Sequence, residues 1–271
     1  MADHHRRAPR VLNEGTPDGA LVVLAHGLED SWRNWRPLTR RLDPAWRLVA
    51  LDLPWRAGND YRWRHEALPP RWLRQHLDRL DRAPDLVIAH SYGATAALDL
   101  AARDKLVTGG LVLICPLFRP VTEPVDWTVV ERSRISFDRH LRAAVRVSIG
   151  PRADRLEPEL LDAMIDVVAA RIGPAGFLAA LDQFVASSYL DLPAIAAPAL
   201  FLIGGADPTL VRRTPQVLAE RMPGARVLVD ESYDHFCHVR RADPVAGEIG
   251  RFVTDFAVLP SARTGAARGR P

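Results

Sequence analysis

The chain has 271 residues, of which 48% are hydrophobic, and its 36 basic and 33 acidic residues give a formal net charge of +3. This composition supplies a sizeable core, and the interleaving of arginines with acidic residues argues against a nucleic-acid-binding surface. No apolar run approaches the roughly 18–20 residues that span a bilayer, and two cysteines exclude a disulfide scaffold, so we expect a cytoplasmic protein without a membrane partner.

The first half of the chain predicts short strands separated by helical stretches. Residues 1–10 are polar and basic, lack the apolar segment of a secretion signal, and are expected to be disordered. Val11 and Leu12 favour an edge strand. Further strands are expected at 21–26, 47–52, 86–90 and 110–115, and a helix is indicated by Trp72, Leu73, His76, Leu77 and Leu80, which recur at helical spacing.

Between Pro116 and Pro193 the alternation of strands and helices stops. Prolines break the chain first, and helical patterns then occupy about 127–147, 157–172 and 174–189. Apolar residues gather on one side of each of the last two patterns, as in the series Leu160, Leu161, Met164, Ile165 and Val168. We therefore expect an all-helical insertion over residues 117–189.

The strand pattern resumes after the insertion, at 199–204 and 226–230, and a helical segment follows at 245–256. Residues 259–271 are rich in Gly, Ala, Arg and Pro and are expected to form a disordered tail. Strands that alternate with helices predict an α/β fold with a mostly parallel sheet covered on both faces. Its core would comprise residues 11–116 and 190–258.

Ser91 stands at the point where an apolar strand meets a helical pattern. The small residues Ala89 and Gly93 flank it at two positions on either side and allow the backbone to turn tightly. A serine held exposed at such a turn becomes a nucleophile when a base lies beside it. The alternative interpretation is that Ser91 only caps the helix that follows.

Four more polar motifs follow apolar strands, and their order along the chain is informative. They are His26-Gly27-Leu28, Asp52-Leu53-Pro54, the loop Gly204–Pro208 that contains Asp207, and Asp234-His235-Phe236. Together with the turn at Ser91, this series resembles the α/β-hydrolase superfamily over residues 11–257, including its order of Ser, Asp and His. The resemblance implies an α/β-hydrolase fold in which the helical insertion forms a cap after the strand-six position.

The resemblance also implies roles for these residues. Ser91 would be the nucleophile, His235 the base that takes its proton, and Asp207 the carboxylate that orients the imidazole. The backbone N–H groups of Leu28 and Tyr92 would form the oxyanion hole. Two alternatives stay open, since His238 lies near His235 and Glu123 is the carboxylate nearest the strand-six position.

The sequence departs from the family pattern in two places and suggests a pocket wall. Trp55 replaces a glycine after Asp52-Leu53-Pro54, and Asp234 replaces a glycine before His235. Aromatic residues are expected to line the substrate pocket, namely Trp32, Trp35, Tyr92, Phe177 and Phe184.

The sequence gives no sign of a metal or organic cofactor. Cys115 and Cys237 lack zinc-ligand spacing, and the chain has no Gly-rich phosphate loop, so neither kind of cofactor is expected.

The function favoured by the sequence is a serine hydrolase that cleaves an ester, thioester or lactone of a small, largely apolar acyl substrate through an acyl-enzyme. A role in natural-product metabolism would suit such a substrate. Two alternatives are a lyase, cyclase or acyl transferase on the same fold, and a non-catalytic ligand-binding protein. The sequence leaves the oligomeric state open.

Overall fold

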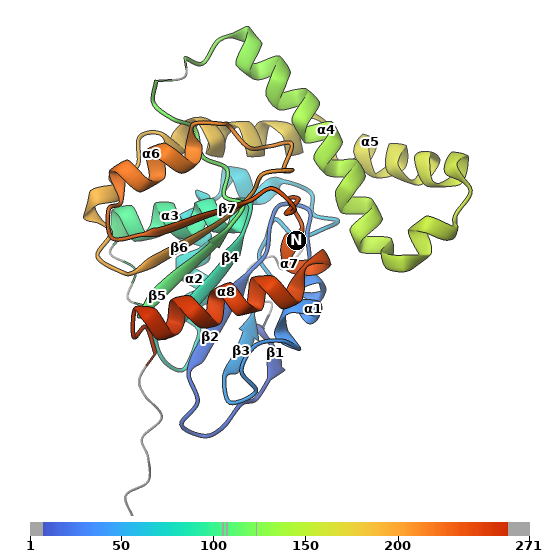
Figure 1. Cartoon of the computed structure of the whole chain (residues 1–271). Helices are drawn as coiled ribbons and strands as arrows, with labels where there is room; N and C mark the ends of the chain where they lie inside the picture. Colours follow the sequence, from blue (N-terminus) through green and yellow to red (C-terminus); the bar gives the residue numbers. More distant parts are fainter. Residues whose placement is uncertain (1–7, 105, 107, 123, 260–271) are drawn as a thin grey trace, which may run out of the picture.

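The computed structural model describes residues 8–104, 106, 108–122 and 124–259, which fold around one sheet of seven strands (Figure 1). The strands are β1 (Arg10–Asn13), β2 (Leu21–Ala25), β3 (Arg47–Ala50), β4 (Leu86–His90), β5 (Gly110–Ile114), β6 (Ala199–Gly204) and β7 (Arg226–Asp230). Their order across the sheet is β1-β3-β2-β4-β5-β6-β7. Only the pairing of β1 with β3 is antiparallel, so the α/β-hydrolase fold predicted from the sequence is confirmed.

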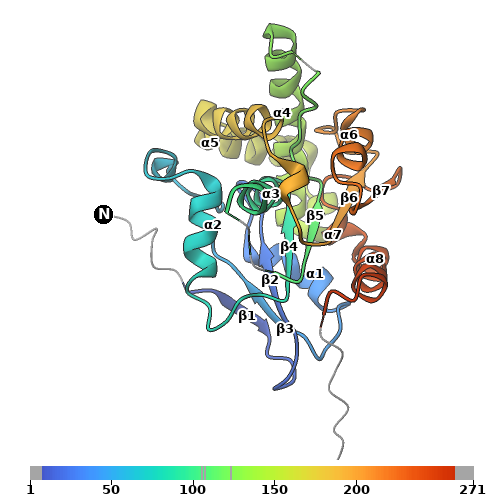
Figure 2. The same cartoon turned by 90° about the vertical axis from the view of Figure 1, so that its left-hand side faces the viewer.

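Helices cover both faces of the sheet. On one face lie α2 (Pro69–Leu77), α3 (Tyr92–Asp104) and α6 (Thr214–Arg221), and on the other lie α1 (Arg36–Thr39), α7 (Cys237–Arg240) and α8 (Ala242–Asp255) (Figure 2). Along β2, Leu21, Val23 and Ala25 belong to the first core, whereas Val22 and Leu24 belong to the second. Because the strands are buried on both faces, they are continuously apolar rather than alternating.

Two long helices, α4 (Trp127–Ile149) and α5 (Pro158–Ser187), form the inserted cap above the carboxyl ends of the strands (Figures 1 and 2). Asp126 begins α4 by accepting the backbone N–H of Val129. The cap is tied to the core by two ion pairs, from Arg171 to Glu29 and from Arg64 to Asp182. Glu29 belongs to the loop after β2, so the cap contacts the loop that carries Leu28.

Helix α5 consists of two helical segments that meet at Gly173. This residue has a φ of 55°, which favours glycine, and Pro174 follows it. By length and composition this helix is long and apolar enough to cross a membrane, and 22% of its apolar window is buried in the structure. Charged residues such as Arg171 and Asp182 divide the helix into short apolar runs. For this reason the sequence, which has no single long apolar run, predicted no membrane-spanning segment.

The ends of the chain differ slightly from the expectation. β1 begins at Arg10, inside the segment that was expected to be disordered, because Arg10 pairs with Ala50 of β3. The rest of that segment before Ala8, and the tail from residue 260 onward, lie outside the described residues.

Candidate active site

Ser91 lies between β4 and α3 in the left-handed backbone region, with a φ of 52°. A non-glycine residue in this region costs energy and is held there by its surroundings. The backbone N–H of Ser91 donates to the carbonyl of Ile114 on β5 at 2.8 Å, and its own carbonyl accepts from Thr95. The turn therefore presents the Ser91 side chain at the carboxyl edge of the sheet.

We expect Gly93→Ala to disrupt this turn. A Cβ atom at position 93 would lie 2.5 Å from the carbonyl oxygen of His26 and 2.7 Å from that of Ala25, and both are backbone atoms. Such overpacking costs about 1–3 kcal/mol, more than the helix propensity of alanine returns. Thermal unfolding should show a Tm lowered by several degrees. Gly247→Ala is the control, because its nearest neighbours are the flexible ends of Arg251; an unchanged Tm for Gly93→Ala would contradict the argument.

Asp207 and His235 form a buried pair beyond the ends of β6 and β7. The Nδ1 atom of His235 lies 2.6 Å from Oδ2 of Asp207, and Thr209 donates its backbone N–H and its hydroxyl to Oδ1 at 2.8 Å each. Burial acts to raise the pKa of Asp207, but the charge and hydrogen bond of His235 and the bonds from Thr209 outweigh it and lower the pKa to about 2. Asp207 is therefore ionised at neutral pH.

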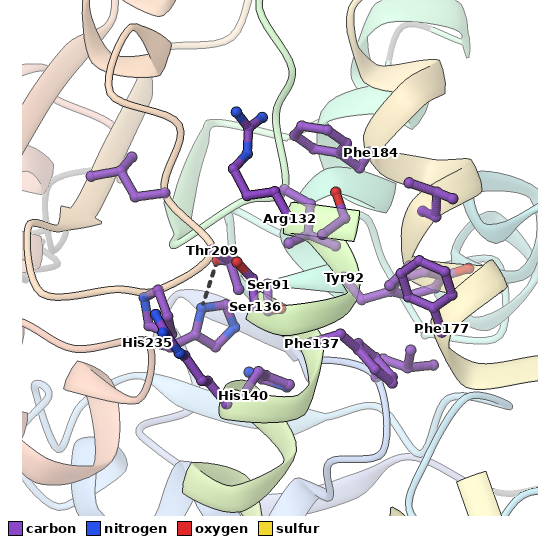
Figure 3. Close-up of a pocket in the computed structure, with 18 of the residues that line it drawn as sticks. Ser91, Tyr92, Arg132, Ser136, Phe137, His140, Phe177, Phe184, Thr209 and His235 are labelled. Atoms are coloured by element: carbon purple, nitrogen blue, oxygen red, sulfur yellow. Dashed lines mark hydrogen bonds between the residues drawn. The ribbon is translucent and has the colours of Figure 1, made fainter. Parts of the chain in front are cut away.

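The second ring nitrogen of His235 faces away from Asp207. Its Nε2 is buried and has no hydrogen-bond partner among the described residues. Figure 3 shows Ser91, Thr209 and His235 grouped on one side of a pocket, opposite Phe137 and Phe177. The structure thus places Ser91 and His235 in one pocket and pairs His235 with Asp207, while the roles of these residues stay a prediction. Glu123 lies outside the described residues.

The loop after β2 carries Leu28, which lines the same pocket as Ser91. Within the described residues, the backbone N–H of Leu28 has no hydrogen-bond partner, and the same is true of Tyr92 at the start of α3. Trp55, which replaces the family's glycine, is fully buried and donates its indole N–H to the carbonyl of His26 at 3.0 Å. This substitution therefore anchors the loop that carries Leu28.

The pocket between the cap and the core has a volume of about 290 Å³. Phe177 and Phe184 line it as predicted, together with Phe137 from α4, and Tyr92 lies at its base. The arginines of the lining are Arg132 and Arg139, both exposed on α4. The pocket is consequently apolar at its wall and basic toward solvent.

Trp32 and Trp35 were expected in the pocket, but the structure places their rings elsewhere. Trp35 is buried in the core beneath α1 and α8 and packs against His238, with ring centroids 4.9 Å apart. Trp32 lies beneath the guanidinium groups of Arg33 and Arg36. Both belong to the short helix Trp32–Trp35, whose position after the loop turns them toward the second core rather than the cap.

Sequence reasoning missed His140, a histidine of the cap that reaches the site. Its ring contacts that of His235 edge to face, with centroids 4.5 Å apart, and stacks on Phe236 at 5.2 Å. Burial first, and the nearby charge of His235 second, lower the pKa of His140 to about 3. His140 lies one turn after Ser136 on α4, among other residues that line the pocket. The sequence could not identify it, because the orientation of the insertion over the core was not known.

The low pKa of His140 predicts an acid-dependent loss of stability. The unfolded chain binds a proton at this position below about pH 6.5, whereas the folded protein binds it only near pH 3, so stability is full above pH 6.5 and falls as the pH drops. We expect His140→Phe to remove about 1.4 kcal/mol per pH unit of this dependence between those values. Urea unfolding at several pH values measures it; parallel curves for both proteins would contradict the prediction.

Among the described residues, two buried groups have the spacing of metal ligands. One comprises Asp30, His90 and His238, and the other Cys115, Asp207 and His235. In each group the carboxylate already faces a histidine, because Asp30 lies 3.5 Å from Nδ1 of His90, just as Asp207 pairs with His235. Cys237 is buried beside them as a free thiol. The expectation that the site needs no metal stays a prediction.

The comparisons with known proteins agree with this fold. A family model described as "Alpha/beta hydrolase family" matches residues 22–248. A pimeloyl-[acyl-carrier protein] methyl ester esterase of Neisseria meningitidis is 26% identical over 260 residues, which cover 90% of this chain and 80% of that protein. Epoxide hydrolase 3 of Xenopus tropicalis is 30% identical over 107 residues, or 38% of this chain, and the match spans only 29% of that protein's length.

Solved structures show the same architecture at low sequence identity. A membrane phospholipase A, described as a bacterial virulence factor, has a TM-score of 0.69 at 18% identity, over 92% of this chain and 86% of that one. An enol-lactonase from Burkholderia xenovorans LB400 has a TM-score of 0.61 at 21% identity, over 91% and 95% of the two chains. At these identities the likeness establishes the fold alone.

Proposed function

Since this chain belongs to the alpha/beta hydrolase family, we propose that it is a serine hydrolase that cleaves an ester, thioester or lactone of a largely apolar acyl substrate. The observation that carries this proposal is the Asp207–His235 pair, joined at 2.6 Å, in which His235 lines the same pocket as Ser91, a serine held at a φ of 52°. The apolar wall of that pocket supports an apolar acyl group. The methyl ester cleaved by the Neisseria relative supports an ester as the reacting bond.

In the proposed mechanism each of these groups has a distinct role. Oγ of Ser91 attacks the carbonyl carbon while Nε2 of His235 takes its proton, and the N–H groups of Leu28 and Tyr92 stabilise the negative oxygen. His235 then gives the proton to the leaving oxygen or sulfur, which departs as an alcohol or thiol and leaves an acyl-enzyme. Water loses a proton to His235, attacks the acyl carbon and releases the acid, and the proton returns to Ser91.

Covalent labelling tests the nucleophile directly. A fluorophosphonate probe should add to the wild-type protein, as read by intact mass, and should not add to Ser91→Ala. A panel of esters and thioesters then measures turnover. Adduct formation on both proteins, or no adduct on wild-type protein whose melting curve shows that it is folded, would overturn the assignment of Ser91.

We expect Asp207→Asn to lower kcat about 10³–10⁴-fold. An amide can donate to Nδ1 of His235, which places the imidazole proton on Nε2 and prevents that atom from acting as a base. Thr209→Val is the matched comparison, because it removes one hydrogen bond to the carboxylate and leaves its charge, and it should cost about tenfold or less. Near-normal turnover of Asp207→Asn would move the acid to another residue, such as Glu123.

A further inference from the structure

A second cavity, of about 230 Å³, adjoins Ser91 between the loop after β2 and the cap. The two cavities share three lining residues, Leu28, Ser91 and His140. A group that reacts at Ser91 therefore has space on two sides, and His140 stands between them.

The linings of the two cavities differ in chemistry. The first holds three phenylalanines and four leucines. The second has one aromatic ring besides its histidines, Phe236. Its lining adds hydroxyl and amide side chains from Ser31, Asn34 and Ser148, and charged side chains from Glu29, Asp30 and Arg33. A substrate that fills both cavities is therefore apolar at one end and hydrogen-bonding at the other.

The acidic groups of the second cavity are already balanced by positive or donor groups. Oδ1 of Asp30 accepts from the N–H of Ser31 at 2.6 Å and from the amide of Asn34, and its other oxygen faces His90. Glu29 pairs with Arg171 of the cap. Because these carboxylates are satisfied, the cavity favours a neutral group with hydroxyls over a cation.

His140, which lines both cavities, carries no charge. Its ring is only 9% exposed, and burial lowers its pKa to about 3, so it carries no charge near neutral pH. A neutral imidazole offers one donor and one acceptor to a hydroxyl and does not select for an anion. His140 therefore adds no charge to the second cavity, whose charged side chains are those of Glu29, Asp30 and Arg33.

We propose that the second cavity is a subsite for a compact, hydroxyl-bearing part of the substrate, while the first cavity holds its apolar part. The substrate class is an amphipathic ester whose two parts lie on opposite sides of Ser91. This inference rests on the proposed function, in which Ser91 is the nucleophile.

Three alanines of the cap allow a matched test. Ala144 lines only the second cavity, Ala180 lines only the first, and Ala143 lines neither. Each is changed to Phe in the full chain, and Ser148→Leu, at an exposed position of the second cavity, is a gentler variant of the first change. Melting curves and fluorophosphonate labelling show that each variant is folded and retains its nucleophile.

Four esters complete the design. Monohexanoylglycerol and hexyl glycerate carry hydroxyls on opposite sides of the ester bond, and hexyl hexanoate and methyl hexanoate carry no hydroxyl. At least one hydroxylated ester should exceed hexyl hexanoate tenfold in kcat/KM for the wild type. Ala144→Phe should remove this advantage and leave methyl hexanoate within about twofold, whereas Ser148→Leu should reduce the advantage in part. Ala180→Phe should impair every hexanoyl ester, and Ala143→Phe none.

The outcomes separate the two proposals. If the wild type does not label at all, the proposed function fails first. If it labels but shows no preference for a hydroxylated ester, or if Ala144→Phe affects hydroxylated and methyl esters equally, the second cavity is not a polar subsite, and the proposed function stands.

Discussion

Ser91→Ala is expected to lower kcat by about 10⁶, to the level supported by the remaining groups of the site. The substitution removes the atom that forms the acyl-enzyme, while the Asp207–His235 pair and the N–H groups of Leu28 and Tyr92 are unchanged. Among the described residues no hydrogen bond involves the Ser91 hydroxyl, so the stability should change little. Single-turnover kinetics with the best ester of the panel measures the loss.

Ser91→Gly separates the chemical role of this residue from its strained backbone. It should be as inactive as Ser91→Ala, but at least as stable, because glycine accepts a φ of 52° without the steric cost that alanine bears. Substrate binding should persist in both variants, as measured by calorimetry. Turnover above one-hundredth of wild type in Ser91→Ala would contradict the nucleophile assignment, and a clearly less stable Ser91→Gly would contradict the strain argument.

The sheet and the site around Ser91 were accessible from the sequence for a physical reason. Strands buried on both faces are continuous apolar runs, and in a parallel sheet their carboxyl ends meet at one edge, so the polar residues that follow β4, β6 and β7 converge. Ser91, Asp207 and His235 follow those strands directly or within a few residues. Their order along the chain resembles that of the α/β-hydrolase family, and this resemblance implied that they meet.

The cap residues and the two tryptophans could not be placed in this way. Helical spacing predicted helices at 127–147, 157–172 and 174–189, but it did not give the rotation of α4 over Ser91, which brings His140 against His235. Trp32 and Trp35 follow the loop closely in sequence, yet the short helix between Trp32 and Trp35 turns them into the core instead of the pocket. The direction in which a side chain points after a loop depends on tertiary packing, which the local sequence pattern does not contain.

His235→Ala is expected to cost about as much as the loss of Ser91, since the two residues act as one unit. Without this imidazole, no base paired with Asp207 takes the serine proton or returns it to the leaving group. His140, the other imidazole of the pocket, is a poor substitute because its pKa is lowered to about 3. The neighbouring His238 cannot replace His235 either, because it is fully buried between the rings of Trp35 and His90 and lines neither cavity. Burial also lowers the pKa of His238 well below its usual value, so it is a poor proton acceptor.

His238→Ala is therefore the matched control for His235→Ala, as both remove a buried imidazole from the same segment. It should lower the Tm through the cavity that it leaves, yet keep kcat within about tenfold of wild type. Added imidazole should restore part of the turnover of His235→Ala and none of any loss in His238→Ala, because only the former opens a space beside Ser91. A folded His238→Ala protein that is inactive, alongside an active His235→Ala, would transfer the role of base to His238.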